Sequence, residues 1–287
     1  MNKNISIAIT AALVMNGGIV NAQEATNIGK HNITLSKDVM TPETLWAMGR
    51  IGSAQASPDG NKIVYQVGYY SVKENRGHQV IYVMDSDGQN VRQLTTSAKS
   101  EGSPVWLDNH TIAFLLDGQI WSMNSDGTNR KKLSSSDIEI EGFRFSPDGK
   151  KVLLIKSIPY YGTIKKNPSD LPKASGRLIT DMNYRHWDHY VETIAHPFVA
   201  EVTANGISKN DVDIIEGEPY ESPLAPFGGI EQFDWSKDSK QIAYTCRKKE
   251  GVKYAVSTDA DIYLYNIDTK KTVNLCKPAD YVEPETN

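Results

Sequence analysis

The sequence lacks several features that would point to common classes of function. Its 287 residues include 31 basic and 35 acidic side chains, so the formal net charge is -4. Because there is no basic surplus, the electrostatic footprint of a nucleic-acid-binding protein is missing, and no nucleic-acid partner is predicted. The chain also contains no Gly-x-Ser-x-Gly nucleophile motif and no glycine-rich phosphate-binding loop. We therefore assign no catalytic residue, and we predict no cofactor.

Cysteines are scarce, since only Cys246 and Cys276 are present. An oxidising compartment would permit a disulfide between them. However, the strand pattern described below places them on the second and fourth strands of one sheet, so their Cα atoms should lie about 10 Å apart. A disulfide requires a separation below about 7 Å, and we therefore predict free or buried thiols.

Long apolar runs are absent except near the start of the chain. Lys3 precedes an almost wholly apolar stretch from Ile5 to Val20, and small residues lead up to Ala22. This pattern is typical of a signal peptide, and the stretch is shorter than the about 20 residues that a membrane-spanning helix needs. We predict a signal peptide over residues 1–22 that is cut near Ala22, a linker over 23–39, and a periplasmic or secreted mature protein without a membrane span.

The main positive feature is a repeat. MDSDGQNVRQL (84–94) and MNSDGTNRKKL (123–133) agree at six of eleven positions and lie 39 residues apart. A second pattern, a Ser-Pro-Asp-Gly type turn followed by an alternating strand, recurs at ASPDGNKIVYQV (56–67), FSPDGKKVLLIKS (145–157) and WSKDSKQIAYTCR (235–247). Periods of about 40–50 residues with strand content are typical of propeller blades.

One repeat can be followed strand by strand over residues 103–134. SPVW, TIAFLL, QIWSMN and RKKLS each fit a strand, and Asp117-Gly118 fits a hairpin between the second and third. The Ser-Asp-Gly string then lies in the turn between the third and fourth strands. A calcium loop is the weaker interpretation, because the spaced carboxylates and closing Glu of such a loop are missing.

The sequence therefore predicts an all-β fold, an incomplete β-propeller with four-stranded blades like those of TolB or WD40 proteins. We expect a partial propeller over residues 40–280 and a truncated connection over 281–287. The expected blades cover residues 51–95, 101–134, 141–215 and 230–276, and the third carries an insertion over 158–200.

The insertion contains the densest cluster of reactive side chains, YRHWDHY at 184–190. His186 and His189 could contribute to a metal site, but a third protein ligand is not evident, and no metal is predicted. Packing of the aromatic residues against the propeller is the simplest interpretation. A substrate-binding patch is the functional alternative, because aromatic and Arg side chains are favoured anchors. Its candidate residues are Arg185, His186, Trp187 and Asp188. EGEPYESP (216–223) could face a cationic group, but exposed loop glutamates are the simpler expectation.

Three segments resemble a known family. MTPETLWAMGRIGSAQASPDGNKIVYQV (40–67), LPKASGRLITDMNYRHWDHYVETIAHPFVA (171–200) and DIIEGEPYESPLAPFGGIEQFDWSKDSKQIAYTCRKK (213–249) resemble the propeller of serine peptidases of the prolyl-oligopeptidase family, in its dipeptidyl-peptidase branch. RHWD (185–188) also looks like a motif of fungal secreted members. The resemblance covers residues 35–275.

The resemblance implies an N-terminal propeller of roughly seven or eight blades that caps a C-terminal α/β-hydrolase domain. That domain carries a Ser-Asp-His triad and cleaves dipeptides from peptide N-termini. No position of this chain matches the triad, and the chain stops at Asn287. We therefore expect the N-terminal fragment of a secreted or periplasmic dipeptidyl peptidase. It would gate access of the peptide substrate and be inert without its partner, the missing hydrolase domain.

The alternative is a stand-alone TolB-like propeller that acts as a binding protein. If the chain is instead the fragment described above, four blades of a larger ring leave two open edges, so the isolated chain is expected to be marginally stable or to self-associate.

Overall fold

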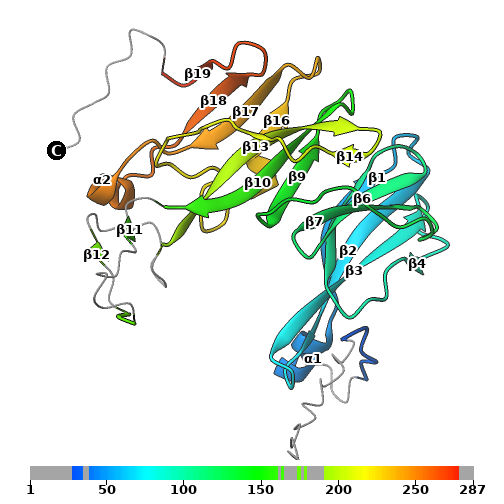
Figure 1. Ribbon diagram of the computed structural model, residues 1–287. Helices are drawn as coiled ribbons and strands as arrows, with labels where there is room; N and C mark the ends of the chain where they lie inside the picture. Colours follow the sequence, from blue (N-terminus) through cyan, green and yellow to red (C-terminus); the bar gives the residue numbers. More distant parts are fainter. Residues whose placement is uncertain are drawn as a thin grey trace, which may run out of the picture.

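The computed structural model describes residues 28–34, 39–160, 163–164, 173–175, 178–179 and 191–277. Figure 1 shows four antiparallel sheets that stand side by side along the chain, preceded by a short helix, α1 (Pro42–Ala47). The strands of each sheet follow one another along the chain, as in a propeller blade, and the third sheet has a hairpin inserted between its second and third strands. The predicted β-propeller fold is therefore confirmed.

The four sheets are called blades 1 to 4. Blade 1 contains β1 (Arg50–Ala56), β2 (Lys62–Ser71), β3 (Arg76–Asp85) and β4 (Arg92–Gln93). Blade 2 contains β5 (Glu101–Trp106), β6 (Thr111–Leu116), β7 (Gln119–Asn124) and β8 (Lys131–Lys132). Blade 3 contains β9 (Ile140–Phe145), β10 (Lys151–Pro159), β13 (Thr193–Thr203), β14 (Gly206–Ile207) and β15 (Val212–Asp213). Blade 4 contains β16 (Phe233–Trp235), β17 (Gln241–Cys246), β18 (Asp261–Asn266) and β19 (Thr272–Asn274).

The remaining elements are short. A two-stranded hairpin is formed by β11 (Thr163–Ile164) and β12 (Leu178–Ile179), between β10 and β13. The 3-10 turn η1 (Ile230–Gln232) precedes β16, and the helix α2 (Gly251–Val256) connects β17 to β18. In the described ranges, no helix is long and apolar enough to cross a membrane.

The recurring Ser-x-Asp pattern closes the turn between the first and second strands of three blades. In each copy the serine hydroxyl donates a hydrogen bond to the aspartate. The residue just before the second strand donates its backbone N–H to the aspartate, and the first residue of that strand donates its N–H to the serine. The hydroxyl-to-carboxylate distances are 2.6, 2.7 and 2.6 Å for Ser57–Asp59, Ser146–Asp148 and Ser236–Asp238. These bonds, the serine contact foremost, lower the pKa of all three aspartates.

The repeated Ser-Asp-Gly string forms the turn between the third and fourth strands of blades 1 and 2. Gly88 donates its N–H to Asp85 O at 2.9 Å, and Gly127 donates to Asn124 O at 2.8 Å. Both glycines have positive φ, at 83° and 87°, which a residue with a Cβ adopts only at a cost. The interpretation of this string as a turn is confirmed.

The hydrophobic core lies between neighbouring blades. Three buried clusters join blade 1 to blade 2, blade 2 to blade 3 and blade 3 to blade 4. A smaller cluster lies on the outer face of blade 1, where Ile28 covers Val67, Tyr69 and Val80. No buried cluster of the described residues joins blade 4 to blade 1, so the two terminal blades each leave one face without a neighbouring blade.

Indole hydrogen bonds connect adjacent blades at equivalent positions. Trp106 Nε1 of blade 2 donates to the carbonyl oxygen of Gln55 in blade 1 at 3.1 Å. Trp235 Nε1 of blade 4 donates in the same way to the carbonyl oxygen of Arg144 in blade 3 at 3.0 Å. Phe145 occupies this position in blade 3 and has no such donor. Two of the three internal interfaces therefore carry an indole hydrogen bond in addition to apolar packing.

Both cysteines are free, as predicted. Cys246 ends β17 and is buried, whereas Cys276 follows β19 and is exposed. Ile262 of β18 donates its backbone N–H to the side-chain sulfur of Cys276 (3.3 Å), which places Cys276 beside β18, and β18 lies between β17 and β19. The intervening strand is the reason that the two thiols do not meet.

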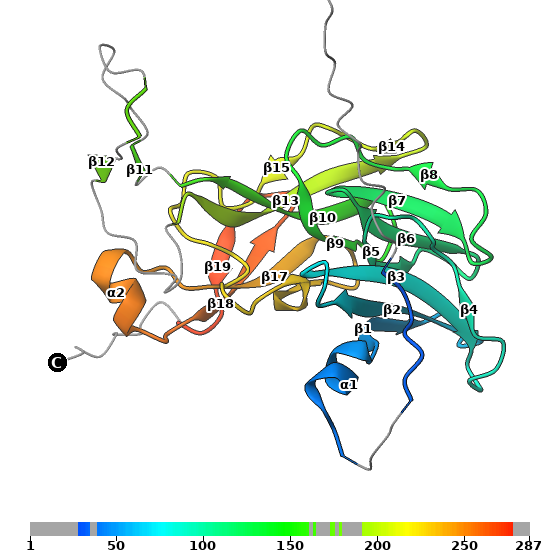
Figure 2. The ribbon, with the colours of Figure 1, turned by 90° about the horizontal axis from the view of Figure 1, so that it is seen from below.

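The long connections gather on one side of the blades. That side carries α1, the extended β2–β3 hairpin, the insertion between β10 and β13, and α2 (Figures 1 and 2). The opposite side carries the short Ser-x-Asp and Ser-Asp-Gly turns. The flanking strands extend to Pro159 and resume at Thr193, so the described ends of the predicted insertion 158–200 belong to the sheet of blade 3.

Replacing Trp235 with Phe should lower the free energy of unfolding by about 1 kcal/mol more than replacing Trp121 with Phe. Both changes remove a similar volume from an inter-blade cluster. In the part of the chain that the structure describes, Trp235 donates an indole hydrogen bond to the neighbouring blade and Trp121 does not. Such a bond contributes about 1 kcal/mol net. Urea unfolding monitored by circular dichroism measures the difference. Equal losses in the two variants would show that the indole bond contributes nothing.

Asp148→Asn should destabilise the protein at neutral pH and have a smaller effect in acid. The lowered pKa of Asp148 means that its ionised form stabilises the folded state above the ordinary Asp pKa of about 3.9, and this contribution is lost as the pH falls through the folded value. The urea midpoints of the two proteins should therefore converge between pH 7 and pH 3. Asp137→Asn is the control, since the Asp137 side chain is 95% exposed. Parallel pH profiles for Asp148→Asn and the parent protein would contradict the assignment.

Candidate functional site

The sequence-based candidate site lies outside the described residues. Arg185, His186, Trp187 and Asp188 all fall in the undescribed part of the insertion, as does His189. The structure describes the insertion's attachment points, where Tyr160, Val191 and Ile194 form a small buried cluster against Ile158. Within the described ranges, no group of three or more His, Cys, Asp or Glu side chains is arranged to hold a metal ion.

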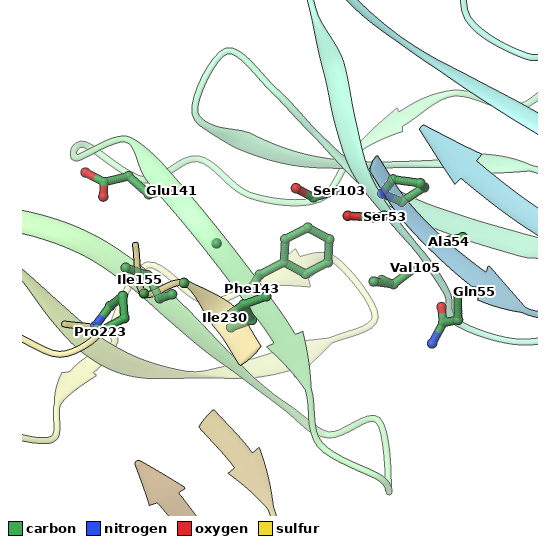
Figure 3. Close-up of a pocket in the computed structure, with 14 residues that line it drawn as sticks. Ser53, Ala54, Gln55, Ser103, Val105, Glu141, Phe143, Ile155, Pro223 and Ile230 are labelled. Carbon is green, nitrogen blue, oxygen red and sulfur yellow. The ribbon is translucent and has the colours of Figure 1, made fainter. Parts of the chain in front are cut away.

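A pocket that the sequence did not predict lies among the inner strands of the blades. Its volume is about 490 Å³, and it is lined by β1, β5, β9 and the segment that precedes β16. Figure 3 shows Ser53, Ser103 and Val105 on one side of it, Glu141, Ile155 and Pro223 on the other, and Phe143 between them. Residues of all four blades or their connections therefore contribute to one cavity.

Irregular strand pairing shapes this pocket. The pairing of β1 with β2 shifts register between Ile51 and Ala54, and the pairing of β5 with β6 shifts between Gly102 and Val105. Bulges of this kind re-aim side chains. A Cβ at Gly102 would lie 2.5 Å from Gln66 Oε1 and 2.6 Å from Gln79 Oε1, so both glutamine side chains would have to move to admit a larger residue. The paired Gly-Ser sequences at 52–53 and 102–103 were the available sequence signal for this site.

The chemistry of the pocket fits binding. Phe143, Ile155 and Ile230 give it an apolar surface, and Glu141 is the single charged residue among those that line it. Its two serines could act as nucleophiles only with a base within hydrogen-bonding reach. The described lining includes no His or Lys. The pocket can therefore accommodate an apolar group together with hydrogen-bond donors, and it lacks the groups for covalent catalysis.

The segment 214–229 forms one wall of the pocket and is firmly held. Ser222 donates its N–H to Ala195 O at 2.9 Å and its hydroxyl to Thr245 O at 2.8 Å. These two bonds hold Ser222 in place, and with it Pro223, the next residue, which lines the pocket. Immediately before Ser222, Glu221 is 2% exposed and accepts a hydrogen bond from the Tyr254 hydroxyl.

The expectation of exposed glutamates in this segment is therefore wrong for Glu221. Glu218 is half-buried and pairs with Lys248 at 2.7 Å, and only Glu216 is exposed as expected. The reason is that Tyr254 of α2 and Lys248, which lies between β17 and α2, supply hydroxyl and ammonium partners from 30 or more residues downstream. The local sequence does not reveal these partners.

A second buried polar group supports the same wall. His196 is fully buried, and its Nδ1 lies 2.8 Å from Asp213 Oδ2. Its cross-strand neighbour Lys156 is also buried, pairs with Asp211 at 2.7 Å and lies 3.8 Å from the centre of the Phe198 ring. These two pairs tie β15 to β10 and β13, directly before segment 214–229 begins. In sequence, His196 was one of several scattered histidines without an evident role.

Comparison with known proteins identifies relatives of the whole described region. No protein-family model matches the chain. The chain is 41% identical over 280 residues to dipeptidyl-peptidase 5 of Porphyromonas gingivalis, which covers 96% of this chain and 40% of that protein. It is 37% identical over 247 residues to dipeptidyl-peptidase 5 of Porphyromonas endodontalis, covering 84% of this chain and 36% of the relative.

A solved structure of lower identity shows the same fold. The acylaminoacyl peptidase of Pyrococcus horikoshii is 13% identical and superposes with a TM-score of 0.53, over 81% of this chain and 33% of that one. At this identity the likeness concerns the fold alone. The sequence relatives are more informative, since they match the inserted segment and the connections as well as the blades. By sequence, this β-propeller chain is similar to the dipeptidyl-peptidase 5 proteins of Porphyromonas, and it spans about two fifths of their length.

Proposed function

We propose that the chain is the N-terminal propeller portion of a serine dipeptidyl peptidase. In this proposal, dipeptides are removed from peptide N-termini at a separate α/β-hydrolase domain, which carries the triad. The observation that carries the proposal is the 41% identity to dipeptidyl-peptidase 5 over 96% of the chain. The described pocket supports it, because it offers binding surface without a nucleophile–base pair.

The propeller would then control which peptide substrates reach the hydrolase domain. The pocket lies among the inner strands, and the long connections lie on one side of the blades. A peptide that approached from that side would meet the insertion and then the apolar residues of the pocket. Narrow access through a propeller favours short, extended chains over folded proteins. The propeller alone would be catalytically inert.

We also propose the cellular location and the domain boundaries that the sequence indicates. Residues 1–22 would be a cleaved signal peptide, 23–39 a linker and 40–280 the propeller portion, in a periplasmic or secreted protein. The apolar stretch Ile5–Val20 and the small residues before Ala22 support this assignment.

The proposal predicts that the 287-residue chain neither hydrolyses dipeptidyl-4-nitroanilides nor reacts with a serine-directed fluorophosphonate probe. Dipeptidyl-peptidase 5 of Porphyromonas gingivalis, treated in parallel, should do both. In the source cells, an antibody against this region should detect a fluorophosphonate-labelled protein more than twice as long. An unlabelled band near 31.9 kDa alone would overturn the peptidase assignment and favour a stand-alone binding propeller.

We further propose that residues 185–188 contact the peptide. Trp187→Ala should weaken binding of a short unstructured peptide to the chain by about tenfold, because a buried aromatic anchor contributes more than about 1 kcal/mol. Isothermal titration calorimetry measures the effect, with His31→Ala as the control. Unchanged affinity in Trp187→Ala, with the control also unchanged, would assign this segment to packing.

A further inference from the structure

The connection between β17 and β18, residues 247–260, is tied to the segment that forms the pocket wall. Lys248 Nζ lies 2.7 Å from Glu218 Oε1, and the Tyr220 hydroxyl donates a hydrogen bond to Glu250 Oε1 at 3.2 Å. Both bonds join residues that are 30 positions apart in sequence. The two segments therefore lie side by side where the connection leaves β17.

A third contact between them, from Tyr254 to Glu221, is buried. Both residues are 2% exposed, and the Tyr254 hydroxyl donates a hydrogen bond to Glu221 Oε1. The guanidinium of Arg247 lies 4.6 Å from the centre of the Tyr254 ring, and its Nη1 donates to Tyr254 O at 3.2 Å. Tyr254 is the one buried residue of α2. This residue therefore fixes the helix to the wall.

A buried carboxylate is an unfavourable way to hold a connection if stability alone matters. Its removal from water must be offset by hydrogen bonds and by a nearby cation. An apolar side chain at position 221 would pack against the Tyr254 ring without that cost, but it would accept no hydrogen bond and would set no direction. The bond from hydroxyl to carboxylate defines one position for Glu221. The arrangement therefore favours a single placement of the wall over maximal stability.

Glu221 acts on the pocket through the chain itself. The next two residues are buried, and the second of them, Pro223, lines the pocket. The lining continues along residues 228–230. Beyond them, Gln232 Oε1 accepts a hydrogen bond from Thr245 Oγ1 of β17 at 2.8 Å. The part of the wall that lines the pocket therefore lies between two held points, Glu221 and Gln232.

We propose that residues 247–256 act as a strap that holds the wall in its pocket-lining position, with Glu221 and Tyr254 as positioning residues for the ligand. When the Tyr254 hydroxyl is bonded to Glu221, Pro223 stands against the cavity and the pocket is complete. When this bond is absent, the wall can move away and the pocket loses one side. The positioning role rests on the proposed binding function of the pocket, whereas the strap itself does not.

Hydrogen–deuterium exchange of Tyr254→Phe tests the strap without any ligand. This variant keeps the ring and removes the hydroxyl. Exchange within residues 218–230 should therefore accelerate about tenfold or more, because a hydrogen bond to a charged group contributes at least that factor. Exchange in β2, β6 and β10 should stay as in the parent protein. Tyr69→Phe is the matched control, since Tyr69 is also buried and its hydroxyl is bonded to that of Tyr82 at 3.0 Å, in blade 1.

Two exchange results would overturn the strap. The first is unchanged exchange within residues 218–230 of Tyr254→Phe. The second is equal acceleration in every blade, because Tyr254 would then support the whole fold and not the wall. If circular dichroism shows that Tyr254→Phe does not fold, Tyr220→Phe takes its place, since it removes the bond to Glu250 and leaves the buried contact intact.

Calorimetric titration with the blocked peptide acetyl-Gly-Ala-Phe-Ala-Gly-amide connects the strap to the pocket. The affinity of Tyr254→Phe should be about tenfold below that of the parent protein, and the affinity of Tyr69→Phe should be unchanged. Equal affinities of the parent protein and Tyr254→Phe would overturn the positioning role. A parent protein that does not bind this peptide, with exchange accelerated as expected in Tyr254→Phe, would instead contradict the proposed binding function and retain the strap.

Discussion

A four-stranded blade has two faces and cannot bury either of them alone. This constraint determines most of the structure, because each blade must find a neighbour for its apolar side chains. The clusters between blades meet it with aliphatic residues such as Val64 and Ile81 on one sheet and rings such as Phe114 on the next. The indole bonds of Trp106 and Trp235 then fix how far one blade slides along another. Hydrogen bonds within a blade hold strands together, whereas the fold as a whole is held by what lies between the blades.

Packing between blades also creates the candidate site. The inner strands approach one another because the sheets that carry them are packed face to face. Bulges at Gly52-Ser53 and Gly102-Ser103 interrupt the regular pairing at this point and turn hydroxyls and backbone toward the shared space. The opposite wall is a connection that is held by residues distant in sequence. Ser222 is hydrogen-bonded to Ala195, and Glu221 is hydrogen-bonded to Tyr254. A rigid frame thus supports a pocket whose surface comes from the least regular parts of the chain.

Local sequence was sufficient for the repeating parts and insufficient for the rest. The turns at Asp59 and Gly88 could be predicted, because their hydrogen bonds and backbone angles involve residues a few positions apart. The separation of the cysteines followed from strand order alone. The burial of Glu221 and His196 could not be predicted, since Tyr254 and Asp213 lie 33 and 17 residues away in sequence and approach them only once the sheets assemble. The pocket depends on the same assembly, and residues 185–188 remain a prediction.

The contrast between the repeating blades and the irregular segments also explains which parts of this chain carry functional information. A peptidase 13% identical to it has the same fold, so the blade pattern is compatible with very different sequences. Alternating apolar residues and Ser-x-Asp turns meet the packing constraint, and they specify little else. The segments that blade geometry does not dictate are the insertion and residues 214–229. There, Glu218 is half-buried and Glu221 is buried, and each has a dedicated partner, an arrangement that a plain connection between blades does not need. The 41% identity to dipeptidyl-peptidase 5 extends across these segments as well as the blades, which is why it carries the functional argument and the fold does not.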